Sequence, residues 1–247
     1  YGGTGRAAPT CIRFRRAIQN GEIKYEDYTN FQMSLRFLAG AMGIPFLPTR
    51  SGLGTDIIGK WGFSEEFRKG DPKIPDEKLI VTDNPFKGWG CGKVVLLPAI
   101  NPDVALIHVQ KADKFGTCRI TGALYADIEQ TKASRAVIVT CEELVDTEEM
   151  RGKPNQNQIP SIHVSAVVHM PYGAYPTACY GYYDYDPFYL KEYAKSAKDE
   201  KLYKEYVEKY IYGVRSHEEF LKLIGTERLQ TIKADPEKGY AVNLDRR

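Results

Sequence analysis

The stretch AVIVTCEEL, residues 136–144, decides the fold class, because an apolar β-branched run ends abruptly in a thiol and two carboxylates. Such a run is typical of a strand in a parallel sheet that is covered on both faces. Ligands of open α/β sheets bind beyond the carboxyl ends of the strands. Cys141, Glu142 and Glu143 are therefore candidate nucleophiles, and the alternative is that they form the polar end of a core strand.

Similar runs occur on both sides of this stretch and predict further strands. The sequence between some of them predicts helix, notably at residues 124–134. This alternation predicts an α/β fold, a three-layer α/β/α sandwich with an open, mostly parallel sheet. The further predicted strands are KVVLLP (93–98), VALIHV (104–109), TCRIT (117–121) and HVSAVVHM (163–170).

Three other regions have a clear local pattern. Apolar spacing over residues 29–41 predicts a largely buried helix, with Thr29 as its N-cap and Gly43 as its stop. Pro45 and Pro48 predict that residues 44–56 form an ordered loop. Residues 187–225, rich in Lys, Glu and Tyr, predict two amphipathic helices separated near Gly213.

The composition describes a globular chain with balanced charge. Its 247 residues are 43% hydrophobic, and 34 Lys and Arg face 32 Asp and Glu. The charges are mixed along the chain, which argues against nucleic acid as a partner. No apolar run approaches the roughly 20 residues of a membrane span. Five cysteines without a C-x-x-C pair fit a reducing cytosol, so we expect a cytoplasmic protein that does not bind membranes.

SGLGTD, residues 51–56, is the first candidate ligand loop. Its glycines would let backbone amides approach a phosphate or carboxylate closely. It has neither the preceding strand of a dinucleotide fingerprint nor the GK[ST] ending of a Walker loop. A tight structural turn is an equally good interpretation.

Other candidates are weaker. Cys91 lies between Lys87 and Lys93 in a second Gly-rich loop but has no neighbouring histidine, which favours a plain loop residue. His108, His163 and His169 lack metal-ligand spacing and are better interpreted as core or sheet-edge histidines. There is no G-x-S-x-G elbow of a serine hydrolase.

A tyrosine-rich segment, PYGAYPTACYGYYDYD and the residues after it (171–190), is too rich in Pro and Gly for a helix. Tyrosine pairs an apolar ring with a polar tip, which suits a protein interface or a pocket wall. A packed surface loop is an equal alternative.

Taken together and in order, these motifs resemble the A-type subunit of the family I CoA-transferases, most closely that of the glutaconate CoA-transferase type, across nearly the whole chain. The resemblance implies an open α/β/α fold of the CoA-transferase / NagB-RpiA-like kind, with residues 1–247 as one A-type domain and residues 187–247 as its closing helical segment. The motifs are GEIKYEDY (21–28), GIPFLP (43–48), SGLGTD, DNPF (83–86), VVLLPA (94–99), residues 103–120, VTCEELV (139–145), residues 171–186 and GTERL (225–229).

The resemblance also implies a chemistry. An A-type and a B-type subunit work together, commonly as a heterotetramer, to transfer CoA from an acyl-CoA to a carboxylic acid through a glutamyl-CoA intermediate. The catalytic glutamate of such enzymes resides on the B-type subunit, so no catalytic residue is expected on this chain. CoA is a substrate here, and neither a cofactor nor a metal is expected. In this context Glu142 and Glu143 are expected to cap, pair or orient at the sheet's edge, and Cys141 to be a small buried residue.

Substrate contacts are expected at two places on this chain. Tyr1 is not an initiator Met, and the Gly-rich strand-turn-helix with which A-type subunits usually open is absent. Near the present start, Thr4 and Gly5 fall, with an offset of one residue, where relatives have a Ser-Gly close to the bound acyl group. The Gly-rich loop supplies the other expected contacts, namely Ser51, Gly52, Gly54 and Thr55.

Two alternatives stay open. Some A/B pairs of this architecture are CoA-thioester hydrolases that open a ring in steroid breakdown, and they place an essential acid before the PFLP motif. An ungapped count puts Asn30 at that position, which cannot act as a base, although Glu26 and Asp27 lie close by. The second alternative is a structural subunit without chemistry of its own.

Overall fold

The computed structural model describes residues 11–88, 90 and 92–245. Within them, short 3₁₀ segments occur at Pro154–Gln156 and Ser161–His163, and a π-helical turn at Glu208–Tyr212. The described helices are α1 (Ile12–Gln19), α2 (Asn30–Met42), α3 (Glu65–Lys69), α4 (Asp127–Ala133), α5 (Thr147–Gly152), α6 (Pro187–Ser196), α7 (Glu200–Val207), α8 (His217–Ile224) and α9 (Thr226–Ile232). The described strands are β1 (Phe46–Thr49), β2 (Ile80–Asp83), β3 (Lys93–Pro98), β4 (Val104–Asp113), β5 (Cys118–Arg119), β6 (Ala136–Val145) and β7 (Ala166–His169).

The central sheet has four strands in the order β5-β4-β6-β7. β4, β6 and β7 are parallel, and β5 joins the end of β4 in antiparallel fashion. On one face of the sheet Val109, Val137, Val139 and Cys141 are completely buried in a shared apolar cluster. The predicted α/β class with an open, mostly parallel sheet is confirmed.

A second sheet corrects part of the prediction. The KVVLLP run forms β3, which pairs antiparallel with both β1 and β2 instead of joining the parallel sheet. The predicted loop at residues 44–56 is wrong at its start, because β1 is a strand that contains Pro48. β1 lies at the edge of its sheet, where a residue without an N–H is tolerated.

The ends of α2 are those predicted. Thr29 forms a capping box with Gln32, in which each side chain accepts from the backbone N–H of the other residue. Gly43 ends the helix in the left-handed conformation, with φ of 68°. The expected burial of its apolar residues is wrong for Phe31, which is 60% exposed. Arg36 is buried instead, its guanidinium stacked 4.3 Å from the ring centre of Tyr28.

The C-terminal region has more helices than expected. The predicted break near Gly213 is present, but a further break after Ser196 separates α6 from α7, and Asp199 caps the new helix. Their apolar faces meet in a cluster rich in tyrosine, including Tyr183, Tyr189, Tyr206 and Tyr210. The hydroxyls of Tyr183 and Tyr210 donate to Glu142 and Glu192, which are not members of the apolar cluster.

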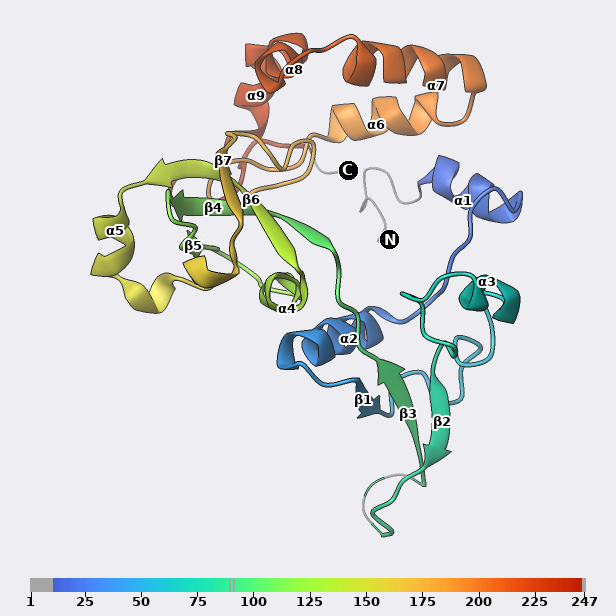
Figure 1. The fold of residues 1–247 in the computed structure, drawn as a ribbon. Coiled ribbons are helices and arrows are strands. Elements are labelled where there is room, and N and C mark those ends of the chain that lie inside the picture. Colours follow the sequence, from blue (N-terminus) through green and yellow to red (C-terminus); the bar gives the residue numbers. More distant parts are fainter. Residues whose placement is uncertain (1–10, 89, 91, 246–247) are drawn as a thin grey trace.

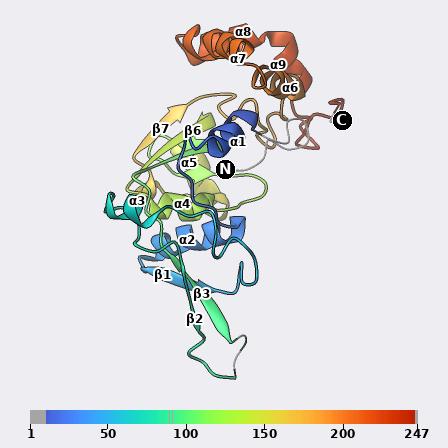
Figure 2. The same cartoon turned by 90° about the vertical axis from the view of Figure 1, so that its right-hand side faces the viewer.

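Figures 1 and 2 show how these parts are arranged. Helices α6–α9 lie at one end of the molecule and the sheet β1-β3-β2 at the other, with the parallel sheet between them. Helix α1 is tied to the C-terminal helices, because Arg13 pairs with Glu200 at 2.6 Å and Arg16 donates to the carbonyl of Lys198. Among the described residues, no helix is both long and apolar enough to cross a membrane.

Asp186 joins several segments of the C-terminal region. Its buried carboxylate caps α6 by accepting from the N–H groups of Phe188 and Tyr189, accepts from the hydroxyl of Tyr175 at 2.6 Å, and pairs with Arg228 at 2.6 Å. A buried carboxylate is stable only with such partners.

We expect Asp186→Asn to lower the free energy of unfolding by about 2 kcal/mol, because an amide keeps the cap but loses the charge-assisted bonds. Asp199→Asn is the matched control: Asp199 is an exposed N-cap, and its variant should lie within about 0.5 kcal/mol of wild type. Urea denaturation of both variants provides the measurement. Equal stability of the two would contradict the role given to Asp186.

Candidate functional site

A cavity of about 590 Å³ lies between α1 and the start of α2. Its wall is largely apolar, with Arg15 and Asp27 adding charges of opposite sign. Such a mixed, concave surface suits a ligand with an apolar body and a charged end. The lining residues are Phe14, Arg15, Ile18, Gln19, Tyr25, Glu26, Asp27, Tyr28, Asn30 and Met33.

Glu26 stabilises this wall of the cavity. Its carboxylate forms a buried ion pair with Arg68 and accepts from the hydroxyl of Tyr28 at 2.8 Å and from the N–H of Phe63 at 3.3 Å. Removing one partner of a buried pair leaves an uncompensated charge, so Glu26 and Arg68 hold each other in place. Burial also raises the pKa of Tyr28. The carboxylate of Glu26 is thus occupied and is a poor candidate base.

The neighbouring candidates for an acid differ from Glu26. Asn30 is the first residue of α2, it lines the cavity, and its side chain is an amide. Asp27 is exposed on the same wall, anchored through its backbone N–H to the carbonyl of Trp61. Of Glu26, Asp27 and Asn30, it is Asp27 that presents an exposed carboxylate to the cavity.

The SGLGTD loop is attached to the N-terminus of α2. Ser51 shares a hydrogen bond of 3.2 Å with the Thr29 hydroxyl, and its carbonyl accepts from the buried side chain of Gln32 at 2.9 Å. The Thr55 hydroxyl closes the turn onto the carbonyl of Gly52 at 2.7 Å. These contacts support the structural-turn interpretation and place the loop next to Asn30. A substrate-binding role for Ser51, Gly52, Gly54 and Thr55 stays a prediction.

Three further candidates from the sequence, Thr4, Gly5 and Cys91, lie outside the described residues.

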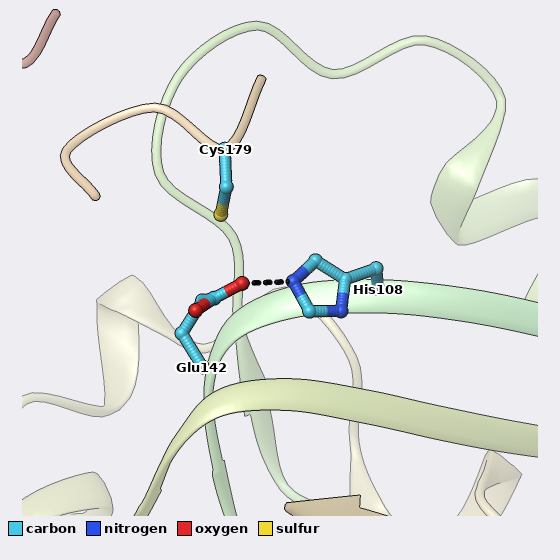
Figure 3. Close-up of side chains that lie close together, drawn as sticks. All are labelled: His108, Glu142 and Cys179. Carbon is cyan, nitrogen blue, oxygen red and sulfur yellow. Dashed lines mark hydrogen bonds and ion pairs between the residues drawn. The ribbon is translucent and has the colours of Figure 1, made fainter. Parts of the chain in front are cut away.

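The VTCEEL stretch ends β6 in a hydrogen-bond network around Glu142. This carboxylate, in a residue 5% exposed, accepts from the Tyr183 hydroxyl at 2.6 Å and from the N–H of Tyr172 at 2.8 Å. His108 on β4 contacts the same carboxylate through Nε2 at 2.6 Å (Figure 3). Its Nδ1 lies 2.8 Å from the hydroxyl of Thr140. Glu142 therefore joins β4, β6 and the tyrosine-rich segment.

The roles of Glu143 and Cys141, which flank Glu142 in the sequence, also follow from their surroundings. Glu143 accepts from the Tyr182 hydroxyl at 2.6 Å and pairs with Lys111, and these two partners lower its pKa. Cys141 is completely buried, and burial raises the pKa of its thiol to about 11, so it is not a thiolate nucleophile. The interpretation of these residues as pairing, orienting and core groups is confirmed.

The tyrosine-rich segment covers the end of the sheet. Tyr183 is 1% exposed and stacks on Tyr172, with ring centres 4.7 Å apart. Gly173 allows the close approach, because a Cβ at this position would lie 2.7 Å from the ring of His108. The sequence suggested either a protein interface or pocket wall, or a packed surface loop. Both interpretations are incomplete, because the inner residues of this segment belong to the core.

His108 and His169 lie on strands of the parallel sheet, as expected, whereas His163 ends a short 3₁₀ segment. His169 ends β7, where its Nε2 contacts the carbonyl of Glu142 at 3.1 Å. Sequence reasoning missed Cys179, whose Sγ lies within 4.8 Å of the ligand atoms of both His108 and Glu142. No sequence spacing could reveal this, because the three residues come from separate segments.

Sequence and fold comparisons find close relatives. The model of the coenzyme A transferase family matches residues 4–170. The A-type subunit of glutaconate CoA-transferase from Acidaminococcus fermentans is 40% identical over 94% of this chain and 72% of that protein. The A-type subunit of 3-oxoadipate CoA-transferase from Pseudomonas knackmussii is 30% identical over 84% of this chain and 68% of its own length. The crystal structure of glutaconate coenzyme A-transferase from A. fermentans matches with a TM-score of 0.91 at 38% identity, over 97% of this chain and 75% of that chain.

Gly52 and Gly54 form a matched pair for testing the loop. Both have positive φ, 86° and 77°, but a Cβ at Gly52 would lie 2.7 Å from Nε2 of Gln32, whereas one at Gly54 meets nothing within 4 Å. We expect each alanine variant to lose about 1 kcal/mol of stability through backbone strain. Gly52→Ala should lose about 1 kcal/mol more, because the bond from Gln32 to Ser51 is disturbed.

Urea denaturation measures this difference, and equal losses would show that Gln32 moves aside without cost. Gly54→Ala also tests the predicted substrate contact. If it leaves turnover and KM unchanged, the loop is structural only.

Glu142→Gln should lower the free energy of unfolding by about 2 kcal/mol or more, because an amide cannot accept all the bonds that the carboxylate receives. Glu143→Gln is the control, since Glu143 is exposed and its change should stay within about 0.5 kcal/mol. Denaturation curves of the two variants test the difference. A Glu142→Gln protein of wild-type stability would disprove the proposed role of the network.

Proposed function

The chain belongs to the coenzyme A transferase family, and we propose that it is the A-type subunit of a heteromeric acyl-CoA:carboxylate CoA-transferase of the glutaconate type. The observation that carries this proposal is its 40% identity over 94% of the chain to the A-type subunit of the A. fermentans enzyme, together with the TM-score of 0.91 to that enzyme's structure. The proposed partner is the B-type subunit of the CoA-transferase, and the proposed substrates are an acyl-CoA and a carboxylic acid.

The proposed reaction proceeds through covalent intermediates. A glutamate carboxylate attacks the thioester carbonyl carbon, the carbon–sulfur bond breaks, CoA leaves as a thiolate, and an acyl-glutamyl anhydride is formed. The CoA thiolate then attacks the glutamyl carbonyl carbon, which releases the first carboxylate and forms a glutamyl-CoA thioester. The carboxylate of the acceptor acid then attacks the glutamyl-CoA thioester. The same steps run in reverse and give the new acyl-CoA and the free glutamate. CoA is a substrate of this cycle, and the cycle uses no further cofactor.

The contacts of this chain's own acids support a nucleophile on the partner. Glu142 is enclosed by hydrogen-bond donors, Glu143 is paired with Lys111 and Tyr182, and Glu26 is paired with Arg68. A nucleophilic carboxylate has to be free to reach the thioester. Glu26, Glu142 and Glu143 stabilise the fold and are therefore poor nucleophiles. We assign the catalytic glutamate to the B-type subunit.

The contribution of this chain is proposed to be the acyl pocket. The cavity between α1 and α2 offers an apolar wall, including Phe14 and Ile18, for the carbon chain of the acid. Arg15 on the same wall would pair with a second carboxylate, because a guanidinium can donate two parallel bonds to it. A dicarboxylic acid is therefore the proposed substrate class, in keeping with the names of both relatives.

The ring-opening hydrolase is the alternative. That reaction would need a base on this chain near the start of α2. Asn30 is an amide and Glu26 is held in a buried ion pair, so two of the three positions do not fit. The geometry favours the transferase, and Asp27 is the residue on which the alternative depends.

Trapping the covalent intermediate tests the proposal. The complex of both subunits is incubated with glutaconyl-CoA and treated with hydroxylamine or borohydride, and the modified peptide is identified by mass spectrometry. We expect the label on a glutamate of the B-type subunit. A labelled glutamate on this chain would overturn the division of labour.

Variants of this chain sharpen the same test. Asp27→Asn should reduce turnover by less than about tenfold and leave the label unchanged, whereas loss of an essential base would cost about 10² to 10⁴-fold. Glu142→Gln should weaken the assembly of this chain with the B-type subunit more than it reduces labelling of the glutamate on that subunit. A Glu142→Gln complex that assembles normally but cannot be labelled would return Glu142 to the active site, and release of CoA without an acceptor acid would support the hydrolase.

A further inference from the structure

His108, Glu142 and Cys179 bring three different metal-ligating groups to one point. Their imidazole, carboxylate and thiol atoms all lie within 4.8 Å of one another. Figure 3 shows the three side chains converging from β4, β6 and the tyrosine-rich segment. The transferase chemistry proposed above uses none of these atoms. We propose that this cluster is a binding site for a borderline-soft divalent metal ion, with Zn²⁺ as its preferred occupant.

The ligand types select the metal. Imidazole nitrogen, carboxylate oxygen and thiolate sulfur are the three groups that bind Zn²⁺ in proteins, whereas Mg²⁺ and Ca²⁺ prefer oxygen alone. In a tetrahedral zinc site the ligand atoms lie about 3.6 Å apart, given bond lengths of about 2.0–2.3 Å. Binding would therefore separate Nε2 of His108 from the Glu142 carboxylate, which now lie 2.6 Å apart, by about 1 Å and replace their hydrogen bond with two bonds to the metal, while Sγ of Cys179 lies within 4.8 Å of both. The fourth position is left to a water molecule.

The surroundings hold the ligands as a metal site requires. The Thr140 hydroxyl lies 2.8 Å from Nδ1 of His108, so it can accept an N–H there while Nε2 faces the metal. The Tyr183 hydroxyl and the Tyr172 N–H orient the carboxylate of Glu142. Such outer contacts fix ligand geometry and strengthen metal binding.

The charge and access of the cluster also fit a cation. A divalent ion would displace the thiol proton of Cys179 to solvent and offset the negative charges of the thiolate and of Glu142. The His108 side chain is 15% exposed, which leaves a path for the ion.

Binding at this site has a structural consequence. Cys179 belongs to the segment that covers the sheet, and His108 and Glu142 belong to neighbouring parallel strands. A metal bound by all three would cross-link the segment to the sheet. Metal binding should therefore raise the melting temperature of the protein.

Cobalt titration of the purified, chelator-treated protein tests the site. We expect one Co²⁺ per chain, tetrahedral visible bands, a thiolate-to-cobalt charge-transfer band in the near ultraviolet, and displacement by Zn²⁺. Cys179→Ser should abolish the charge-transfer band. Cys118→Ser, which alters a buried thiol in the apolar cluster of the sheet, should retain it.

One further variant completes the test. His108→Gln should weaken Zn²⁺ binding by at least about tenfold. A charge-transfer band that persists in Cys179→Ser, or the lack of stoichiometric Co²⁺ binding to wild type, would overturn the proposal. Neither result depends on whether the protein transfers CoA.

Discussion

The carboxylate of Glu142 is the group on which the middle of the structure depends. A charge in a residue only 5% exposed is stable only if donors surround it, and its donors come from two other segments, namely His108 on β4 and Tyr172 and Tyr183 above the sheet. Separating either of these segments would remove at least one donor from the buried charge. The same requirement explains why a tyrosine-rich loop packs inward instead of remaining a surface feature.

The same principle governs the wall of the cavity. Glu26 and Arg68 are distant in sequence, yet both are buried and each compensates the charge of the other. Acidic residues that look available in the sequence are therefore used to assemble the fold. This use of carboxylates agrees with the proposed division of labour, in which the reactive carboxylate is assigned to another polypeptide.

Local signals in the sequence predicted local structure well. The β-branched run at residues 136–140 became a parallel core strand. Thr29 began α2 through its side-chain cap, and Gly43 ended it because a residue without a Cβ adopts positive φ easily. The pairing of β3 with β1 could not be predicted, because short apolar runs do not reveal their partners and Pro48 fits only an edge strand. The meeting of Cys179 with Glu142 depends on the path of an entire loop, which no spacing rule describes.

Helix α1 forms one wall of the cavity while its arginines are fastened to the far end of the chain. The shape of the pocket is thus set partly by residues more than 180 positions away, which do not line it themselves. Substitutions on α7 that remove the pair between Arg13 and Glu200 would therefore change the shape of this cavity without altering its lining. A cavity can thus change shape through the support of a wall as readily as through the wall itself.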